Sequence, residues 1–114
     1  METTEILMSV EEFIKTVKCT FCEMVTFCDE FDADIKEHEE NNYFPMEYIQ
    51  YMDDQLKEVE KDFEVLSEGL IKDYPPYIWI KLSKDKMNVI SKLTYSRSKI
   101  SRLKLKALIG GVGL

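Results

Sequence analysis

The chain has 114 residues, of which 45% are hydrophobic and 32% charged, and its formal net charge is −7. This length suits one domain with a modest core, and a composition poor in glycine and proline favours helices. No stretch approaches the roughly 18 consecutive apolar residues of a membrane-spanning helix. The start of the chain also lacks the basic residues and long apolar run of a secretory signal. We therefore expect a single helical domain over residues 1–114, with no membrane segment.

The first helix is predicted over residues 9–40. Ser9 and Glu12 form the Ser-x-x-Glu pattern of a capping box, which marks a helix start. Apolar residues then recur three and four positions apart and share one helical face, wide enough to contact two neighbours. The members of this face are Val10, Ile14, Val17, Phe21, Met24, Cys28, Phe31 and Ile35.

The second helix is predicted over residues 45–72, after a short polar turn. Pro45 suits the first helical position, where a missing N–H costs little. Residues 73–76, Asp-Tyr-Pro-Pro, are expected to stop the helix. Its apolar face comprises Ile49, Met52, Leu56, Val59, Phe63, Leu66 and Leu70.

The third helix is predicted over residues 75–109, with Gly110 and Gly111 at its end and a flexible tail over residues 110–114. Ser83 and Asp85 also suit the cap of a new helix, so the pattern leaves open whether this helix is continuous. Its apolar stripe comprises Trp79, Leu82, Val89, Leu93, Ile100, Leu103 and Ala107.

Two short connections make consecutive helices antiparallel neighbours. The expected fold is therefore all-α, an antiparallel up-down-up three-helix bundle of long helices. Heptad-like stripes of this length also pair between chains as coiled coils, so a homodimer or higher oligomer is compatible with the pattern.

Charge is unevenly distributed along the chain. Residues 1–79 hold 21 acidic and 6 basic side chains, whereas residues 80–114 hold 9 basic and 1 acidic. Arg97 and Lys104 flank the apolar stripe of the third helix. The other cations share a separate arc, which either binds an acidic partner or relieves repulsion between the two acidic helices. This predicted basic face comprises Lys81, Lys84, Lys92, Lys99, Arg102 and Lys106.

Two further surfaces are candidates for binding a protein. An acidic face on the first two helices, with Asp29, Glu30, Asp53 and Asp54, would engage a basic surface. Exposed aromatic residues anchor one protein in another, or alternatively cap the ends of a core. The candidate anchors are Tyr48, Tyr51, Tyr74 and Tyr77.

No pattern indicates catalysis, a metal site or a cofactor. Cys19 and Cys22 form a Cys-x-x-Cys pair on the outer side of the first helix, whereas Cys28 lies on its apolar face. The only histidine, His38, has no nucleophile at a recognised spacing, and no glycine-rich phosphate loop is present. An odd number of cysteines without an extracellular signal favours reduced thiols and a cytoplasmic location.

We therefore expect a small non-enzymatic helical protein that acts as a regulator, adaptor or inhibitor by binding another macromolecule. A protein partner fits the acidic composition best. Richness in lysine, glutamate and asparagine also suits a protein of a virus or mobile element. The alternative is a nucleic-acid-binding regulator that uses the basic face of the third helix.

Overall fold

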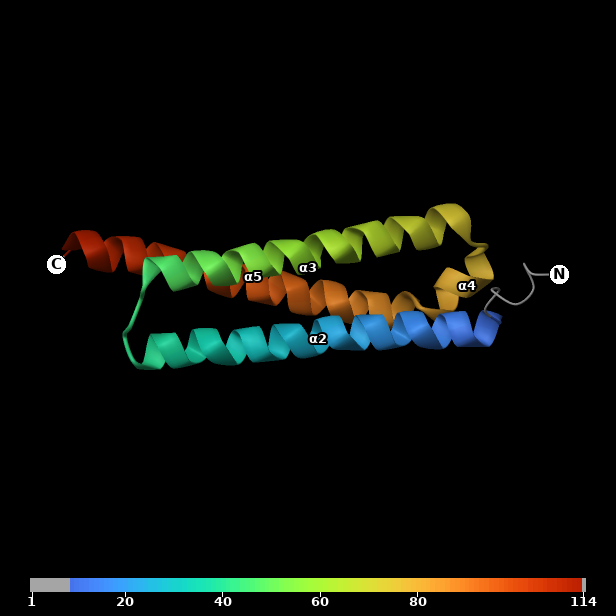
Figure 1. Cartoon of the computed structure of the whole chain (residues 1–114), viewed down its shortest axis with the longest axis horizontal. Helices are drawn as coiled ribbons and strands as arrows, with labels where there is room; N and C mark the ends of the chain where they lie inside the picture. The colour runs from blue at the N-terminus through green and yellow to red at the C-terminus, as the bar shows by residue number, and fades with distance from the viewer. Residues whose placement is uncertain (1–8, 114) are drawn as a thin grey trace.

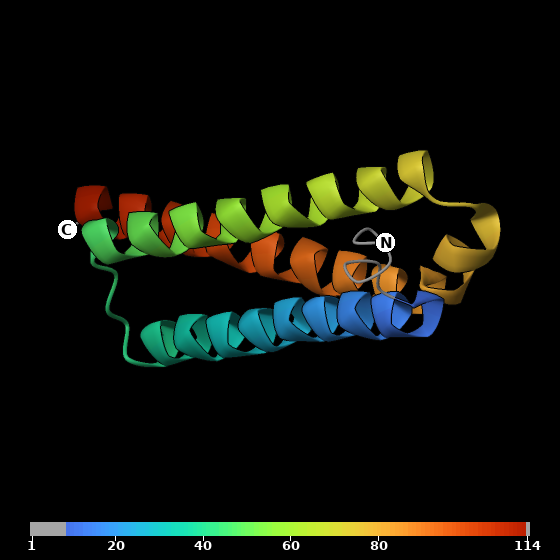
Figure 2. The ribbon, with the colours of Figure 1, turned by 45° about the vertical axis from the view of Figure 1, so that its right-hand side comes forward.

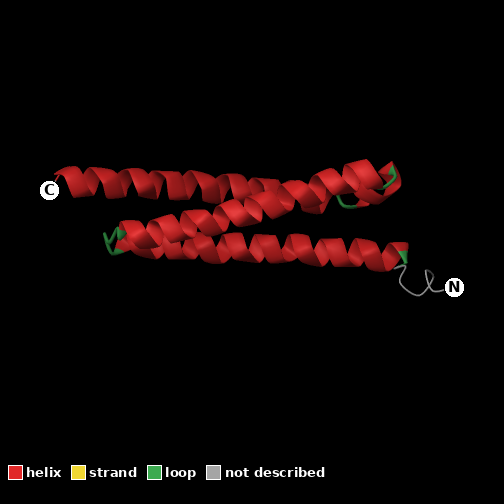
Figure 3. Cartoon of the chain, turned by 45° about the horizontal axis from the view of Figure 1, so that its top comes forward, coloured by secondary structure: helices red, strands yellow, loops and turns green. Residues whose placement is uncertain are grey.

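The computed structural model describes residues 9–113, and within that range every regular element is a helix (Figure 3). The prediction of an all-helical chain is confirmed, but four helices occupy the described range instead of three. Residues 1–8 and 114, including the start that was expected to carry no signal, lie outside the described residues. The helices are α2 (Val10–Glu40), α3 (Met46–Asp73), α4 (Pro76–Lys81) and α5 (Ser83–Gly113).

The predicted capping box opens α2. The Glu12 backbone N–H donates to Ser9 Oγ at 3.1 Å, and the Ser9 backbone N–H donates to the Glu12 carboxylate at 3.3 Å. The helix ends at Glu40 with Asn41 as its C-cap, and Asn42 takes a left-handed φ of 52°, which asparagine tolerates better than most residues. Pro45 caps α3 from just outside the helix instead of occupying its first position.

The sequence left open whether the third helix is continuous, and the structure shows a break at Leu82 that divides it into α4 and α5. This residue has φ −101° and ψ −3°, and Ser83 Oγ donates to the Ile80 carbonyl at 2.8 Å. The break lets both Ile78 and Leu82 turn inward, where they are 5% and 1% exposed. The short helix α4 thus closes the end of the molecule between α3 and α5 (Figure 2).

The predicted end of the third helix at residue 109 is too early, because residues 110–113 continue α5. Neither Gly110 nor Gly111 adopts the positive φ that commonly ends a helix, so the backbone continues in helical conformation.

The molecule is a rod of 67 × 26 × 21 Å with a radius of gyration of 18.2 Å, against about 13 Å for a compact domain of about 100 residues. The helices α2, α3 and α5 lie lengthwise beside one another, and the chain reverses direction from each to the next (Figure 1). No described helix combines the length and hydrophobicity needed to cross a bilayer.

The core is a single seam centred on α5. This helix packs along both α2 and α3, whereas α2 and α3 touch each other little. The predicted apolar stripes supply the buried residues, although Trp79 is only half-buried at the edge of the core. The buried residues of the seam from α5 are Val89, Leu93, Ser96, Ile100, Leu103 and Ala107.

Ser96 is the polar residue that interrupts the apolar stripe of α5. It is fully buried, and its Oγ donates to Asp32 Oδ1 on α2 at 2.8 Å. The hydroxyl is thereby satisfied without water, which explains how a serine occupies a core position.

Candidate protein-binding surface

Three of the six cations in the predicted basic face form ion pairs with α2. Lys92 forms an ion pair with Asp29 at 2.8 Å, and both Arg102 and Lys106 contact Glu39, at 3.3 and 3.0 Å. The prediction of one free outward row of cations is therefore wrong for these three residues. These three cations share two carboxylates of α2, which partly fits the self-neutralising alternative that the sequence left open.

The remaining cations of the predicted basic face do not form a continuous surface. Lys99 lies over the ring of Tyr95 with Nζ 4.9 Å from its centroid, a cation–π contact within α5. Lys81 and Lys84 are exposed on α4 and at the start of α5, and neither forms an ion pair within residues 9–113. Within the predicted basic face, Lys81 and Lys84 are thus the exposed cations without a carboxylate partner among the described residues.

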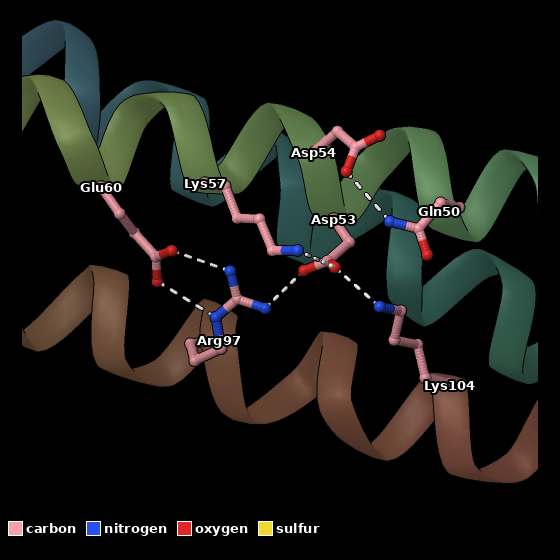
Figure 4. Close-up of polar contacts among 7 residues, drawn as sticks. All are labelled: Gln50, Asp53, Asp54, Lys57, Glu60, Arg97 and Lys104. Atoms are coloured by element: carbon pink, nitrogen blue, oxygen red, sulfur yellow. Dashed lines mark hydrogen bonds and ion pairs between the residues drawn. The ribbon is translucent and has the colours of Figure 1, made fainter.

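Asp53 is at the centre of a buried charge network between α3 and α5 (Figure 4). The residue is 1% exposed, so its predicted place on an exposed acidic face is wrong. Arg97 Nη1 donates to Asp53 Oδ1, Lys104 Nζ donates to Oδ2 at 2.6 Å, and Lys57 Nζ lies 3.4 Å from Oδ2. Arg97 and Lys104 flank the apolar seam, as predicted, but they face this aspartate and not a partner.

Arg97 also bridges to a second carboxylate on α3. It binds Glu60 through two parallel hydrogen bonds, Nε to Oε2 at 3.1 Å and Nη2 to Oε1 at 2.7 Å. Such fork-shaped pairing fixes both partners in position. The network therefore locks the alignment of α3 along α5, and it is a structural feature and not a binding site.

The fold is expected to lose stability in acid through Asp53. Burial alone would raise the pKa of Asp53, but hydrogen bonds from Lys104 and Arg97 lower it from 3.8 to about 2. Because the pKa is lower in the folded chain, this stabilisation is complete above pH 3.8 and is lost as the pH falls through about 2. We expect about 2 kcal/mol to disappear over that interval in urea unfolding experiments.

The variant Asp53→Asn is the control for this pH dependence. Asp32, whose pKa is raised by burial despite the hydrogen bond from Ser96, changes stability in the opposite sense, and it does so above pH 3.8. It is present in both proteins, so the difference between them isolates Asp53. Parallel stability curves for the two proteins between pH 5 and pH 2 would contradict the prediction.

Other acidic side chains on α2 and α3 remain at the surface. Glu23, Glu30, Asp54 and Asp62 are exposed, and none of them forms an ion pair within residues 9–113. Asp54 accepts a hydrogen bond from Gln50 at 2.9 Å (Figure 4). Of the predicted acidic face, Glu30 and Asp54 are therefore available, whereas Asp29 is paired and Asp53 is buried.

A groove runs between α2 and α3 where these two helices fail to meet. Apolar side chains form its floor, and one carboxylate stands on each side, Glu23 from α2 and Asp62 from α3. No residue of α5 lines it. Together the lining residues are Thr20, Glu23, Met24, Phe27, Val59, Asp62 and Leu66.

Aromatic rings bridge α2 to the α3 segment at both ends of this gap. Phe13 stacks on Tyr74 with centroids 4.5 Å apart, and at the opposite end His38 stacks on Tyr48 at 5.1 Å. His38 Nδ1 donates to the Asp34 carbonyl at 2.9 Å, which fixes the ring. These contacts favour the interpretation of Tyr48 and Tyr74 as caps of the core.

The other two predicted anchors are more exposed. Tyr51 is 55% exposed and extends the His38–Tyr48 stack, its centroid 6.1 Å from that of Tyr48. Tyr77 is 56% exposed on α4. Because the helices are antiparallel, Tyr51 and Tyr77 lie toward opposite ends of the rod and do not form one surface.

The three cysteine thiols lie where the sequence predicted, two on the outer side of α2 and one in the core. Cys19 and Cys22 are exposed on α2, Cys28 is buried, and all three are free. Burial raises the pKa of the Cys28 thiol, which keeps it protonated. Among the described residues, no group of three or more metal-binding side chains is arranged to hold an ion.

Two features were not predicted from the sequence, the Asp53 network and the α2–α3 groove. The network had a signal: Asp53 follows Ile49 by four positions and precedes Leu56 by three, which places a carboxylate on the apolar face. The groove had no such signal in the sequence, because its existence depends on the distance between two helices.

Comparison with known proteins gave no match: no family model, no curated protein and no solved structure is similar to this chain. No residue role is therefore carried over from another protein.

Proposed function

We propose that this chain is a small non-enzymatic helical module that acts as a regulator, adaptor or inhibitor of another protein by binding a basic segment of that protein. In this proposal the three long helices act as one antiparallel three-helix bundle whose α2 and α3 carry the binding surface. The three free thiols fit a reducing compartment such as the cytosol.

The observation that supports the proposal is that the acidic charge of α2 and α3 is only partly neutralised. The helix α2 holds ten acidic residues and three lysines, and α3 holds nine acidic residues and three lysines. Cations of α5 pair with the acids that face them, such as Asp29, Glu39 and Asp53. Acids on the outer sides, including Glu30 and Asp54, form no ion pair within residues 9–113.

Unpaired surface carboxylates of this density attract a basic partner over a distance. Complementary charge raises the association rate and discriminates against acidic competitors, and both effects weaken as salt is added. A salt-sensitive complex with a lysine- or arginine-rich protein is therefore the expected interaction.

A second candidate, nucleic-acid binding, is supported by a smaller basic cluster. Lys15 and Lys18 of α2 and Lys81 of α4 line one hollow near the α4 end, together with Glu11 and Ile14. Three phosphate-binding lysines are few for a molecule of net charge −7, because the rest of the surface repels nucleic acid. We therefore favour the protein partner.

The two candidates are separated by charge reversal at different surfaces. In an experiment that captures binding partners from host lysate, the variant Glu30→Lys/Asp54→Lys is expected to lose the basic proteins. The variant Lys81→Glu/Lys84→Glu is expected to retain them. None of these four residues forms an ion pair within residues 9–113, so the fold should be unaffected. Lys92 is unsuitable, because its reversal would also disrupt the pair with Asp29.

The opposite pattern would refute the protein-binding proposal. If Lys81→Glu/Lys84→Glu abolishes a salt-sensitive mobility shift of DNA or RNA while Glu30→Lys/Asp54→Lys leaves all captured proteins unchanged, the chain binds nucleic acid. Circular dichroism of each variant verifies that helix content is unchanged.

A further inference from the structure

The α2–α3 groove exposes apolar side chains that α5 does not cover. Met24 is buried in its floor, whereas Phe27, Val59 and Leu66 are half-buried and already packed against the core. An occupant of the groove would therefore cover a preformed apolar surface without rearranging the helices.

The groove is open only in its middle. Phe13–Tyr74 and His38–Tyr48 bridge the two helical segments at the ends, so α2 and α3 are held together there. On α2 the lining residues run from Thr20 to Phe27, about 10 Å at 1.5 Å per residue. A segment of a few helical turns fits this opening better than a whole domain does.

Charge selects the occupant. Glu23 and Asp62 stand on opposite sides of the groove, neither forms an ion pair within residues 9–113, and no basic side chain lines it. A second copy placed there by the same face would bring these carboxylates against their equivalents. A partner with lysine or arginine beside its apolar residues would instead form ion pairs with both the Glu23 and the Asp62 carboxylates.

We propose that this groove binds one amphipathic helix of a partner protein, whose apolar stripe covers Phe27, Val59 and Leu66 while its flanking lysine or arginine side chains contact Glu23 and Asp62. The inference rests on the proposed function, since it names where and in what form the basic segment binds. Helices pack 8–10 Å apart, and a fourth helix in a groove between two others is a common bundle arrangement.

A rival groove lies between α3 and α5. It is lined by Glu64 and Glu68 but also by Lys86, so its charge is mixed. The Ser67 hydroxyl is buried beside it without a hydrogen-bond partner among the described residues. The mixed charge of this second groove selects less strongly for a basic helix than the α2–α3 groove does. Its two glutamates therefore supply a matched control for Glu23 and Asp62.

The test uses a fluorescent amphipathic peptide of about three helical turns, with leucines three and four positions apart and lysine or arginine beside them. Fluorescence anisotropy measures its affinity for the full chain. Glu23→Lys/Asp62→Lys is expected to weaken binding about tenfold or more, whereas Glu64→Lys/Glu68→Lys, with the same change in net charge, should change it less than about twofold. A scrambled peptide of identical composition should bind at least about tenfold more weakly.

Each other outcome overturns the inference in a distinguishable way. Equal weakening by both variant pairs, or equal binding of the scrambled peptide, means that a basic segment binds without using the groove, and the proposed function survives. Greater weakening by Glu64→Lys/Glu68→Lys places the helix between α3 and α5. A dimer in light scattering that Glu23→Lys/Asp62→Lys dissociates means that a second copy fills the groove. No binding of either peptide refutes the groove proposal, and the capture experiment then decides the proposed function.

Discussion

Replacing Asp53 with asparagine is expected to lower the free energy of unfolding by about 3 kcal/mol. The substitution conserves size but removes the negative charge that Arg97 and Lys104 share at the α3–α5 contact. Removing one partner of a buried ion pair leaves the opposite charge poorly compensated, and this costs more than the intact pair contributes. Arg97 retains Glu60 as a partner and both cations are about 30% exposed, so we expect the loss to lie at the lower end of the range for such pairs.

The neighbouring residue supplies the control. Asp54→Asn makes the same chemical change one position along α3, but Asp54 is exposed and its side chain accepts a hydrogen bond from Gln50 without an ion pair inside the described range. We expect its effect to stay below about 0.5 kcal/mol. Urea unfolding followed by circular dichroism measures both variants, and equal effects would mean that Asp53 is not buried as the structure places it.

Truncating Leu103 to alanine is expected to lower the free energy of unfolding by about 3 kcal/mol. Leu103 is 0% exposed in the seam where α5 packs along both other long helices. Its removal takes away the transfer free energy of the buried side chain and leaves a cavity that a closely packed seam cannot fully close.

Leu105→Ala is the matched control for this truncation. Leu105 lies two positions further along the same helix but is 57% exposed. We expect a change within about 0.5 kcal/mol, since the substitution removes little buried area and alanine favours the helix. A large effect at Leu105 would show instead that this side of α5 is covered in solution, for example by a second copy of the chain.

Local signals in the sequence predicted most of the helical structure. Three- and four-residue spacing identified the buried faces, from Val17 and Phe21 on α2 to Leu103 on α5. The capping box at Ser9 placed the start of α2 correctly, because a cap depends on residues adjacent in the chain. The outward position of Cys19 and Cys22 and the inward position of Cys28 followed from the same periodicity.

The break at Leu82 depended on more than local signals. Periodicity allowed both a continuous helix and a new helix beginning at Ser83. In the structure the break buries Ile78 and Leu82 at the end of the seam, a gain that exists only when α2 and α3 are in place. The continuation of α5 through Gly110 and Gly111 likewise overrode a local stop signal.

The sequence by itself determined an acidic, all-helical chain and the side of each helix on which every charge lies. Only the tertiary structure decided which charges meet, because pairing depends on how neighbouring helices are aligned along their length. Lys92 meets Asp29 across 63 residues of chain, and Arg97 meets Asp53 across 44. The same alignment brings Arg97 and Lys104 to Asp53, and the spacing of α2 from α3 opens the groove beside Glu23 and Asp62. Periodicity describes one helix at a time, whereas these features are properties of pairs of helices.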